Sequence, residues 1–237
     1  MRSMLLGLLV AALAETVTAQ NTSKLDDAIA GECRIANPRS MHPCDAGVAV
    51  DQLARHANVL VGFENTPDCR PSGRARSPGA ANEILTGISA RQAFDHLMTS
   101  MPQYSWKEMN GVVVVRPKAA WENPRNPLNL PTSRFEATDQ RVDNVLHTVL
   151  HAVTPSMFIP HQHVPRPDAP SNRLVDVTFS GGTMLDALNA VVRAHGDLEW
   201  QLGYPGGSEY RAVITLNTLE YPGDAVLAPV ALPQDRR

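Results

Sequence analysis

The sequence has no excess of positive charge and no run of lysine and arginine. Its 21 basic and 24 acidic side chains give a formal net charge of −3 at pH 7. Proteins that bind nucleic acid or an anionic membrane surface usually carry a basic patch or stripe. We therefore predict that the protein binds neither nucleic acid nor an anionic membrane surface.

The sequence also lacks an apolar run long enough to cross a membrane. Its N-terminal apolar stretch, residues 4–13, is shorter than the about 20 residues that a spanning helix needs. It follows the basic Arg2 and precedes small residues at 17–19, a pattern that a signal peptidase cleaves. We predict a signal peptide over residues 1–19, a mature chain from about Gln20 without a membrane span, and a periplasmic or secreted location.

Cysteine is scarce, with only Cys33, Cys44 and Cys69 in the chain. An oxidising compartment permits two of the three to form a disulfide. We prefer a Cys33–Cys44 bridge, which would close a short loop and stabilise the fold by about 3 kcal/mol at most. The competing pair is Cys44–Cys69. Because no Cys-x-x-Cys spacing occurs, a thiolate metal site is not indicated.

Motifs of common catalytic sites are missing as well. No serine lies in a G-x-S-x-G turn, which would activate it as a nucleophile. The run Ser180-Gly181-Gly182 lacks the following Lys-Ser or Lys-Thr of a phosphate-binding loop, so we interpret it as a tight turn between a strand ending at Phe179 and a helix. We predict that the protein is not an enzyme and holds no cofactor. The sequence leaves open a composite site built from distant residues.

What the sequence does contain is an internal repeat. The segment that starts at Ser89 aligns without a gap with the segment that starts at Thr183. In both segments apolar residues recur at the spacing of one helical face. The first set is Ala90, Ala93, Phe94, Leu97, Met98 and Met101, and the second is Met184, Ala187, Leu188, Val191 and Val192.

The two predicted helices also begin in the same way. Ser89 with Gln92, and Thr183 with Asp186, have the three-residue spacing of a capping box. Gly196 follows the second helix and can adopt the left-handed conformation that ends a helix. These local signals fix where both helices begin and where the second one ends.

Each of these helices is followed by two predicted strands, and the first strand carries a tryptophan. The strands cover residues 104–107 with Trp106, 112–116, 198–202 with Trp200, and 212–216. A tryptophan at the same offset in both copies indicates packing against the preceding helix rather than a platform for a ligand.

A further helix is predicted upstream in each half. Its apolar residues are Val50, Leu53, Ala54 and Ala57 in the first half, and Val142, Val145, Leu146, Val149, Leu150 and Val153 in the second. Such helices are not stable alone in water, so two of them should cover a small sheet. The predicted fold class is therefore α+β, with two small repeated modules of two helices on short β-strands.

The predicted modules span residues 32–117 and 133–221. Between them, prolines mark residues 118–132 as a stiff linker, because proline cannot donate to a sheet and favours extended backbone. We expect residues 222–237 to form an unstructured tail.

The first half, residues 46–117, resembles the secretin and TonB short N-terminal (STN) domain. The matching positions are Leu53-Ala54, the run from Gly87-Ile88-Ser89 to Leu97-Met98, Tyr104, Trp106 and residues 111–115. The second half repeats the pattern at Gly182-Thr183, Ala187-Leu188 and Trp200. This resemblance implies a periplasmic interaction module of a bacterial envelope, linked to secretion or TonB-type systems. It departs from that family in context, because the outer-membrane barrel or secretin ring that usually follows is not in this sequence.

Histidine is the one residue type whose spacing suggests a metal site. His147 and His151 share one face of a predicted helix, and His161 and His163 share one side of an extended segment. Four imidazoles would form a site if the loop folded back onto the helix. No carboxylate is placed to orient them, and the alternative is that they are half-exposed helix and loop residues. We predict no resident metal and keep metal binding as the alternative function.

The function that we predict is non-catalytic. The protein is expected to be exported and to bind another envelope protein through an exposed strand edge or a module face. The observations behind this prediction are the missing catalytic motifs and the duplicated pattern of an interaction domain.

Overall fold

The computed structural model describes residues 23–37, 46–67, 82–153, 173–204 and 213–218. The predicted signal peptide and tail lie outside these residues, as do Cys44, Cys69, His161 and His163. Within the described residues, no helix is both long enough and apolar enough to span a membrane.

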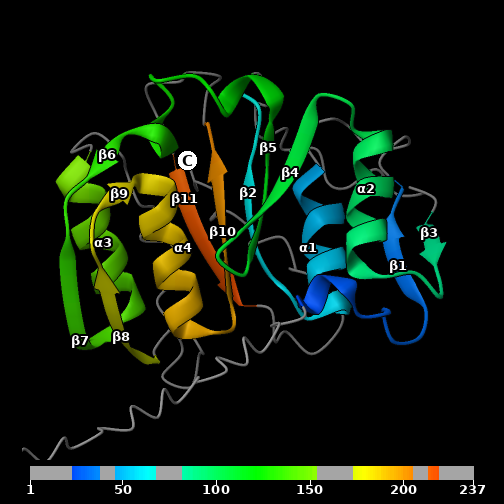
Figure 1. The fold of residues 1–237 in the computed structure, drawn as a ribbon, viewed down its shortest axis with the longest axis horizontal. Coiled ribbons are helices and arrows are strands. Elements are labelled where there is room, and N and C mark those ends of the chain that lie inside the picture. The colour runs from blue at the N-terminus through cyan, green and yellow to red at the C-terminus, as the bar shows by residue number, and fades with distance from the viewer. Residues whose placement is uncertain (1–22, 38–45, 68–81, 154–172, 205–212, 219–237) are drawn as a thin grey trace, which may run out of the picture.

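A mixed five-stranded sheet forms the middle layer of the fold (Figure 1). Its strands are β11 (Val213–Thr218), β10 (Leu198–Gly203), β2 (Leu60–Glu64), β5 (Val112–Pro117) and β4 (Tyr104–Met109), in this spatial order. The three inner strands β10, β2 and β5 are parallel, whereas β11 and β4 run antiparallel to their neighbours. Both halves of the chain therefore contribute strands to a single sheet.

Helices cover both faces of this sheet (Figure 1). The elements on one side are η1 (Lys24–Asp26), β1 (Cys33–Ala36), α1 (Ala46–Ala57), β3 (Asn82–Leu85) and α2 (Ala90–Ser100). Those on the other side are β7 (Phe135–Arg141), α3 (Val142–Val153), β8 (Leu174–Phe179) and α4 (Met184–His195). The pairs β1–β3 and β7–β8 form two-stranded outer sheets, so the molecule is layered β/α/β/α/β.

The central sheet separates two hydrophobic cores. Strand β5 shows why, because Val113 and Val115 face α1 and α2 while Val112 and Val114 face α3 and α4. All four valines are at most 2% exposed. A strand buried on both faces is continuously apolar rather than alternating, which explains this run of valines.

The local predictions for the four helices are confirmed. Ser89 and Thr183 cap α2 and α4 through complete capping boxes, and Gly196 ends α4 with φ of 82°. The tryptophans also pack against these helices. Trp106 Nε1 donates to Asp95 on α2 and Trp200 Nε1 to Asn189 on α4, both at 2.9 Å.

The predicted fold class is wrong. The chain does not form two separate helix-on-strand modules, because β10 from the second half pairs in parallel with β2 from the first half. The described residues form a mixed α/β fold with four α-helices, one five-stranded sheet and smaller two-stranded sheets. The physical reason is that β2 would be an edge strand if the first half folded alone, and its backbone N–H and C=O groups would be exposed there. Pairing with β10 gives these groups hydrogen-bond partners.

The segment predicted to be a linker is also part of this fold. It forms the short helices η4 (Lys118–Ala120) and η5 (Pro127–Asn129) and the strand β6 (Pro131–Thr132), which pairs with β9 (Gly182–Thr183). Its Leu128 is fully buried in the core beside α4. The prolines therefore shape a packed connection between the two halves.

Candidate functional site

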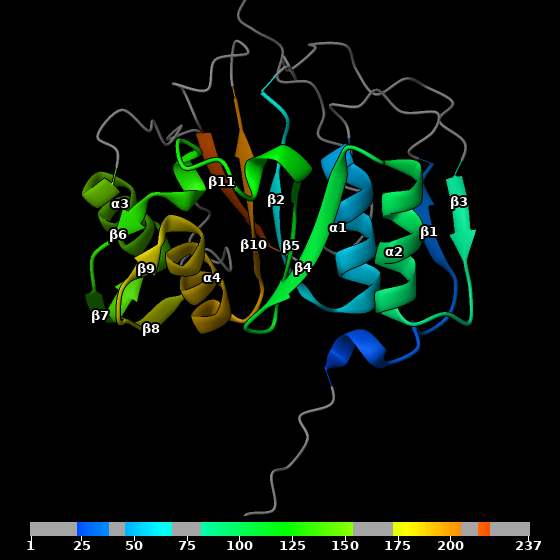
Figure 2. The same ribbon diagram turned by 45° about the horizontal axis from the view of Figure 1, so that its top comes forward.

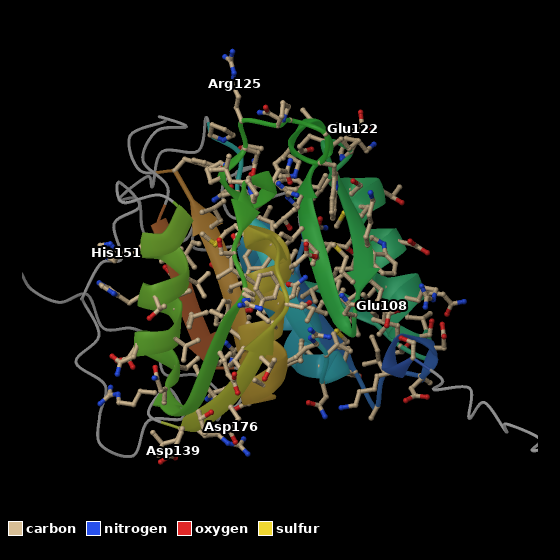
Figure 3. All side chains as sticks on the ribbon, turned by 60° about the vertical axis from the view of Figure 1, so that its left-hand side comes forward. Glu108, Glu122, Arg125, Asp139, His151 and Asp176 are labelled. Carbon is tan, nitrogen blue, oxygen red and sulfur yellow. The ribbon has the colours of Figure 1, made fainter. Side chains whose placement is uncertain are left out.

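A polar cluster lies where the three parallel strands end. Glu64 ends β2, Arg116 is the second-last residue of β5, and Tyr204 directly follows β10. The carboxyl ends of parallel strands meet at one edge of a sheet, where open α/β folds often bind ligands. A pocket of about 90 Å³ opens beside the cluster, and Glu64, Asn126 and Tyr204 line it with prolines and alanines. Figure 3 shows Arg125, also a lining residue, extending away from the molecule.

The centre of this cluster is a buried ion pair. Arg116 Nε donates to Glu64 Oε2 at 2.5 Å, and both side chains are 1% exposed. The other carboxylate oxygen, Oε1, accepts hydrogen bonds from Asn126 Nδ2 at 2.5 Å and from the Tyr204 hydroxyl at 2.6 Å. A buried charge is tolerated when it is paired and its remaining hydrogen-bonding groups have partners, and this carboxylate meets both conditions.

The connecting segment supplies the remaining partners of the guanidinium group. Arg116 donates to the side-chain oxygens of Asn126 and Asn129, both at 2.9 Å, and to the Ala120 carbonyl at 3.2 Å. The Trp121 ring lies over the guanidinium, with 4.9 Å between the ring centroid and Cζ. The cluster therefore fastens residues 118–130 to the end of the sheet.

The side chains of Glu64, Arg116, Asn126 and Tyr204 thus satisfy one another. Asn126 and Asn129 also accept from or donate to backbone groups of their own segment, including the Leu128 N–H and the carbonyls of Ala120 and Asn123. A ligand would have to displace these hydrogen bonds rather than meet a waiting donor or acceptor. We conclude that this polar cluster has a structural role and joins the two halves of the chain.

Two buried tyrosines beside the polar cluster make the free energy of unfolding depend on pH in the alkaline range. Burial, with the nearby Glu64 carboxylate, raises the pKa of Tyr104 to about 12 and also raises the pKa of Tyr204. The folded state therefore favours the neutral phenols. The contribution of Tyr104 is complete below the unfolded-state pKa of about 10 and is lost as pH rises to about 12, whereas the loss of the Tyr204 contribution begins at the same pH and continues beyond that range.

We therefore expect the free energy of unfolding to fall steadily above pH 10. Urea denaturation between pH 8 and pH 11.5 measures it, with Tyr104→Phe and Tyr204→Phe as variants whose alkaline loss should be smaller than that of wild type. An unfolding free energy that stays constant over this range would contradict the prediction.

The second candidate site is the outer edge of β4, the strand that closes the central sheet on one side (Figure 2). Strands β4 and β5 are joined by the two-residue turn Asn110-Gly111, whose φ values of 54° and 80° are those of a type I′ turn. In such a hairpin the flanking residues Met109 and Val112 exchange hydrogen bonds, and every second pair does the same.

This register decides which backbone groups of β4 face away from the sheet. Ser105, Lys107 and Met109 bond to β5, so Trp106 and Glu108 direct their N–H and C=O groups outward. The position of Pro117 agrees with this register. Pro117 lies opposite Tyr104, which is two residues before Trp106 and therefore also in a pair that exchanges no hydrogen bonds, and proline has no N–H to donate. No strand of the described residues pairs with this side of β4.

A half-buried tryptophan flanks the β4 edge on each face of the sheet. Trp106 lies on the α2 side, with its ring 5.6 Å from that of Phe94. On the opposite side, Trp121 Nε1 donates to Ser105 Oγ at 2.8 Å, and Lys107 Nζ lies 4.4 Å from the Trp121 ring centroid. Aromatic side chains fixed by hydrogen bonds offer large contact surfaces at little entropic cost. Sequence reasoning missed Trp121 and the turn, although Asn-Gly between two strands is a strong hairpin signal.

The histidines of the predicted metal cluster are described only in part. His147 and His151 lie on the exposed face of α3, with ring centroids 4.2 Å apart, and Figure 3 shows His151 on the outer side of the helix. His161 and His163 lie outside the described residues. Within those residues, no group of three or more metal-ligating side chains comes together.

The cysteine and serine predictions have different outcomes. Cys33 is fully buried in β1, and burial raises the pKa of its thiol to about 11, so the free thiol is neutral at pH 7. Because Cys44 and Cys69 lie outside the described residues, the choice between the two pairings stays a prediction. The interpretation of Ser180-Gly181-Gly182 is confirmed, since β8 ends at Phe179 and the glycines, with φ of 104° and 155°, lead into α4.

Comparisons of the chain with protein-family models, with curated proteins and with solved structures returned no match.

Proposed function

We propose that the protein is a non-catalytic, exported binding module of the bacterial envelope, and that its partner adds an extended segment to the free edge of β4. The observation that carries this proposal is the outward-facing backbone of Trp106 and Glu108 between two fixed tryptophans. An extended segment that joins a sheet edge gains main-chain hydrogen bonds, and its alternate side chains contact the two faces.

Two further observations support a binding role without chemistry. The buried polar side chains beside the pocket, Glu64, Arg116, Asn126 and Tyr204, bond to one another. The buried thiol of Cys33 is neutral at pH 7, so it lacks the thiolate character of a nucleophile. An envelope location is proposed from the leader-like N-terminus and from the resemblance to the STN domain.

Proline substitution tests which groups of β4 are free. The N–H of Glu108 faces outward, so Glu108→Pro should leave the hairpin folded while removing a donor from the edge. The N–H of Lys107 bonds to β5, so Lys107→Pro should lower the free energy of unfolding by about 3 kcal/mol. Urea denaturation followed by circular dichroism compares the two variants.

The same pair of variants tests the function. After cross-linking in envelope extract, the wild type should yield a specific protein complex, and folded Glu108→Pro should yield much less of it. If folded Glu108→Pro captures the same partner in the same amount, the β4 edge is not the binding surface. Equal destabilisation by both prolines would contradict the hydrogen-bonding register of β4 and β5.

A second candidate function, transition-metal binding, is favoured by the geometry of one helix face. Two exposed histidines one turn apart, His147 and His151, bring their rings within 4.2 Å of each other. Imidazole pairs suit Cu²⁺, Ni²⁺ and Zn²⁺. This pair alone would supply two ligands and leave the remaining positions to water or another molecule.

We expect Cu²⁺ to raise the melting temperature of the wild type and to have no such effect on His147→Ala or His151→Ala, because binding to the folded state alone stabilises it. His56→Ala is the matched control, since His56 is an exposed histidine on α1 without a neighbour at helical spacing. A wild-type titration without binding in the low micromolar range would remove this second candidate.

A further inference from the structure

The two sides of the β4 edge differ in charge. On the α2 side, Glu108 is compensated by Arg91 at 3.6 Å and by a hydrogen bond from Ser23 at 2.9 Å. On the opposite side, the exposed Lys107 forms no ion pair with any described residue and rests over the Trp121 ring. Among the described residues, the Lys107 side therefore carries a positive charge without an ion-pair partner, next to an aromatic surface.

Another cation lies near the hairpin turn. The exposed Arg193 of α4 donates to the Asn110 carbonyl at 3.4 Å, which places its guanidinium at the end of the same hairpin. A lysine on an edge strand also discourages pairing with a second copy of the chain, because two antiparallel β4 strands centred on Lys107 would bring like charges together. The charge thus favours a different partner over self-association.

We propose that the segment which binds β4 alternates acidic and apolar residues, with an acidic side chain opposite Lys107 and an apolar one opposite Trp106. This inference rests on the proposed function. Side chains of an added strand alternate between the faces, and directly opposite residues share a face. An acidic residue on the Lys107 side pairs with its ammonium group, while the next residue along lies against the Trp106 ring.

Three synthetic heptapeptides of one design test this chemistry. Each carries valine at alternate positions, and the positions between are all glutamate, all threonine or all lysine. Trp106 and Trp121 are half-buried at the edge while Trp200 is fully buried, so a change in tryptophan fluorescence reports binding. Dissociation constants are measured for the wild type, for Lys107→Glu and for Glu108→Pro.

We expect the glutamate peptide to bind the wild type about fivefold more tightly than the threonine peptide, and the lysine peptide to bind least well, as for a directly opposite charge pair. In Lys107→Glu the order of the glutamate and lysine peptides should reverse. Glu108→Pro should weaken the binding of all three peptides. High salt should reduce the difference between the charged peptides.

The failures of the two proposals are distinguishable. If the threonine or lysine peptide binds the wild type as tightly as the glutamate peptide and Glu108→Pro still weakens both, the acidic preference is wrong and binding at the edge stands. If no peptide changes the fluorescence, or if Glu108→Pro binds all three as well as the wild type does, binding at the edge is wrong too.

Discussion

Replacing Gly62 by valine should lower the free energy of unfolding by about 3 kcal/mol or more, through overpacking of a close contact. Gly62 lies in β2 directly opposite Trp200 of β10, and the indole ring covers the glycine backbone. A Cβ atom at this position would lie 2.0 Å from Trp200 Cε2 and 2.1 Å from Cζ2. The indole cannot move aside freely, because Trp200 is fully buried and bonded to Asn189.

Gly203→Ala is the control for adding a side chain to a glycine of this sheet. Gly203 lies in β10, and a Cβ atom added there would meet nothing within 4 Å. The control should therefore change stability by no more than about 0.5 kcal/mol. Urea denaturation followed by circular dichroism measures both. A Gly62→Val protein as stable as the control would mean that β2 and β10 do not pack as described.

Gly62 also shows why the sequence did not predict the central sheet. Helix positions depend on signals within a few residues, such as the Ser89 and Thr183 capping boxes, and these predictions are confirmed. Strand pairing depends on contacts between distant residues. That Trp200 would lie over Gly62 is visible in neither local segment, although a glycine inside a strand does indicate a close approach.

One strand did carry a readable signal for its environment. The run of four valines in β5 is apolar on both faces, which is typical of a strand buried between two layers. A small separate module would have covered only one face of it with helices. The alternating pattern of β8, by contrast, fits an outer sheet, since Val175, Val177 and Phe179 are buried and the residues between them are exposed.

The connecting segment was misinterpreted for a related reason. Its prolines correctly indicated extended and turn backbone, but they carry no information about packing. The segment is anchored by Asn126 and Asn129, whose side-chain amides bond to a buried ion pair between β2 and β5, two strands that are distant in the sequence. The candidate edge was foreseen only in general terms, as some exposed strand. Choosing β4 required the order of the whole sheet.

Replacing Arg116 by methionine should lower the free energy of unfolding by about 3 to 5 kcal/mol, as expected when one partner of a buried ion pair is removed. The substitution would leave the Glu64 carboxylate, 1% exposed, without its cation. The side-chain oxygens of Asn126 and Asn129 and the Ala120 carbonyl would each also lose the hydrogen bond that Arg116 donates to them. Because these groups join the sheet to the segment between the two halves, unfolding should remain a single transition at lower urea concentration.

A double-mutant cycle separates the ion pair from the loss of packing. Glu64→Gln with Arg116→Met replaces both charges, so the double variant should be more stable than Arg116→Met alone. Arg34→Met is the surface control. Its ion pair with Glu32 is more than half exposed, and its loss should cost about 0.5 kcal/mol or less. If the loss in the free energy of unfolding of the double variant equals the sum of the losses of the two single variants, the Glu64 and Arg116 side chains do not interact. The hydrogen bonds of the asparagines would then stabilise the polar cluster instead.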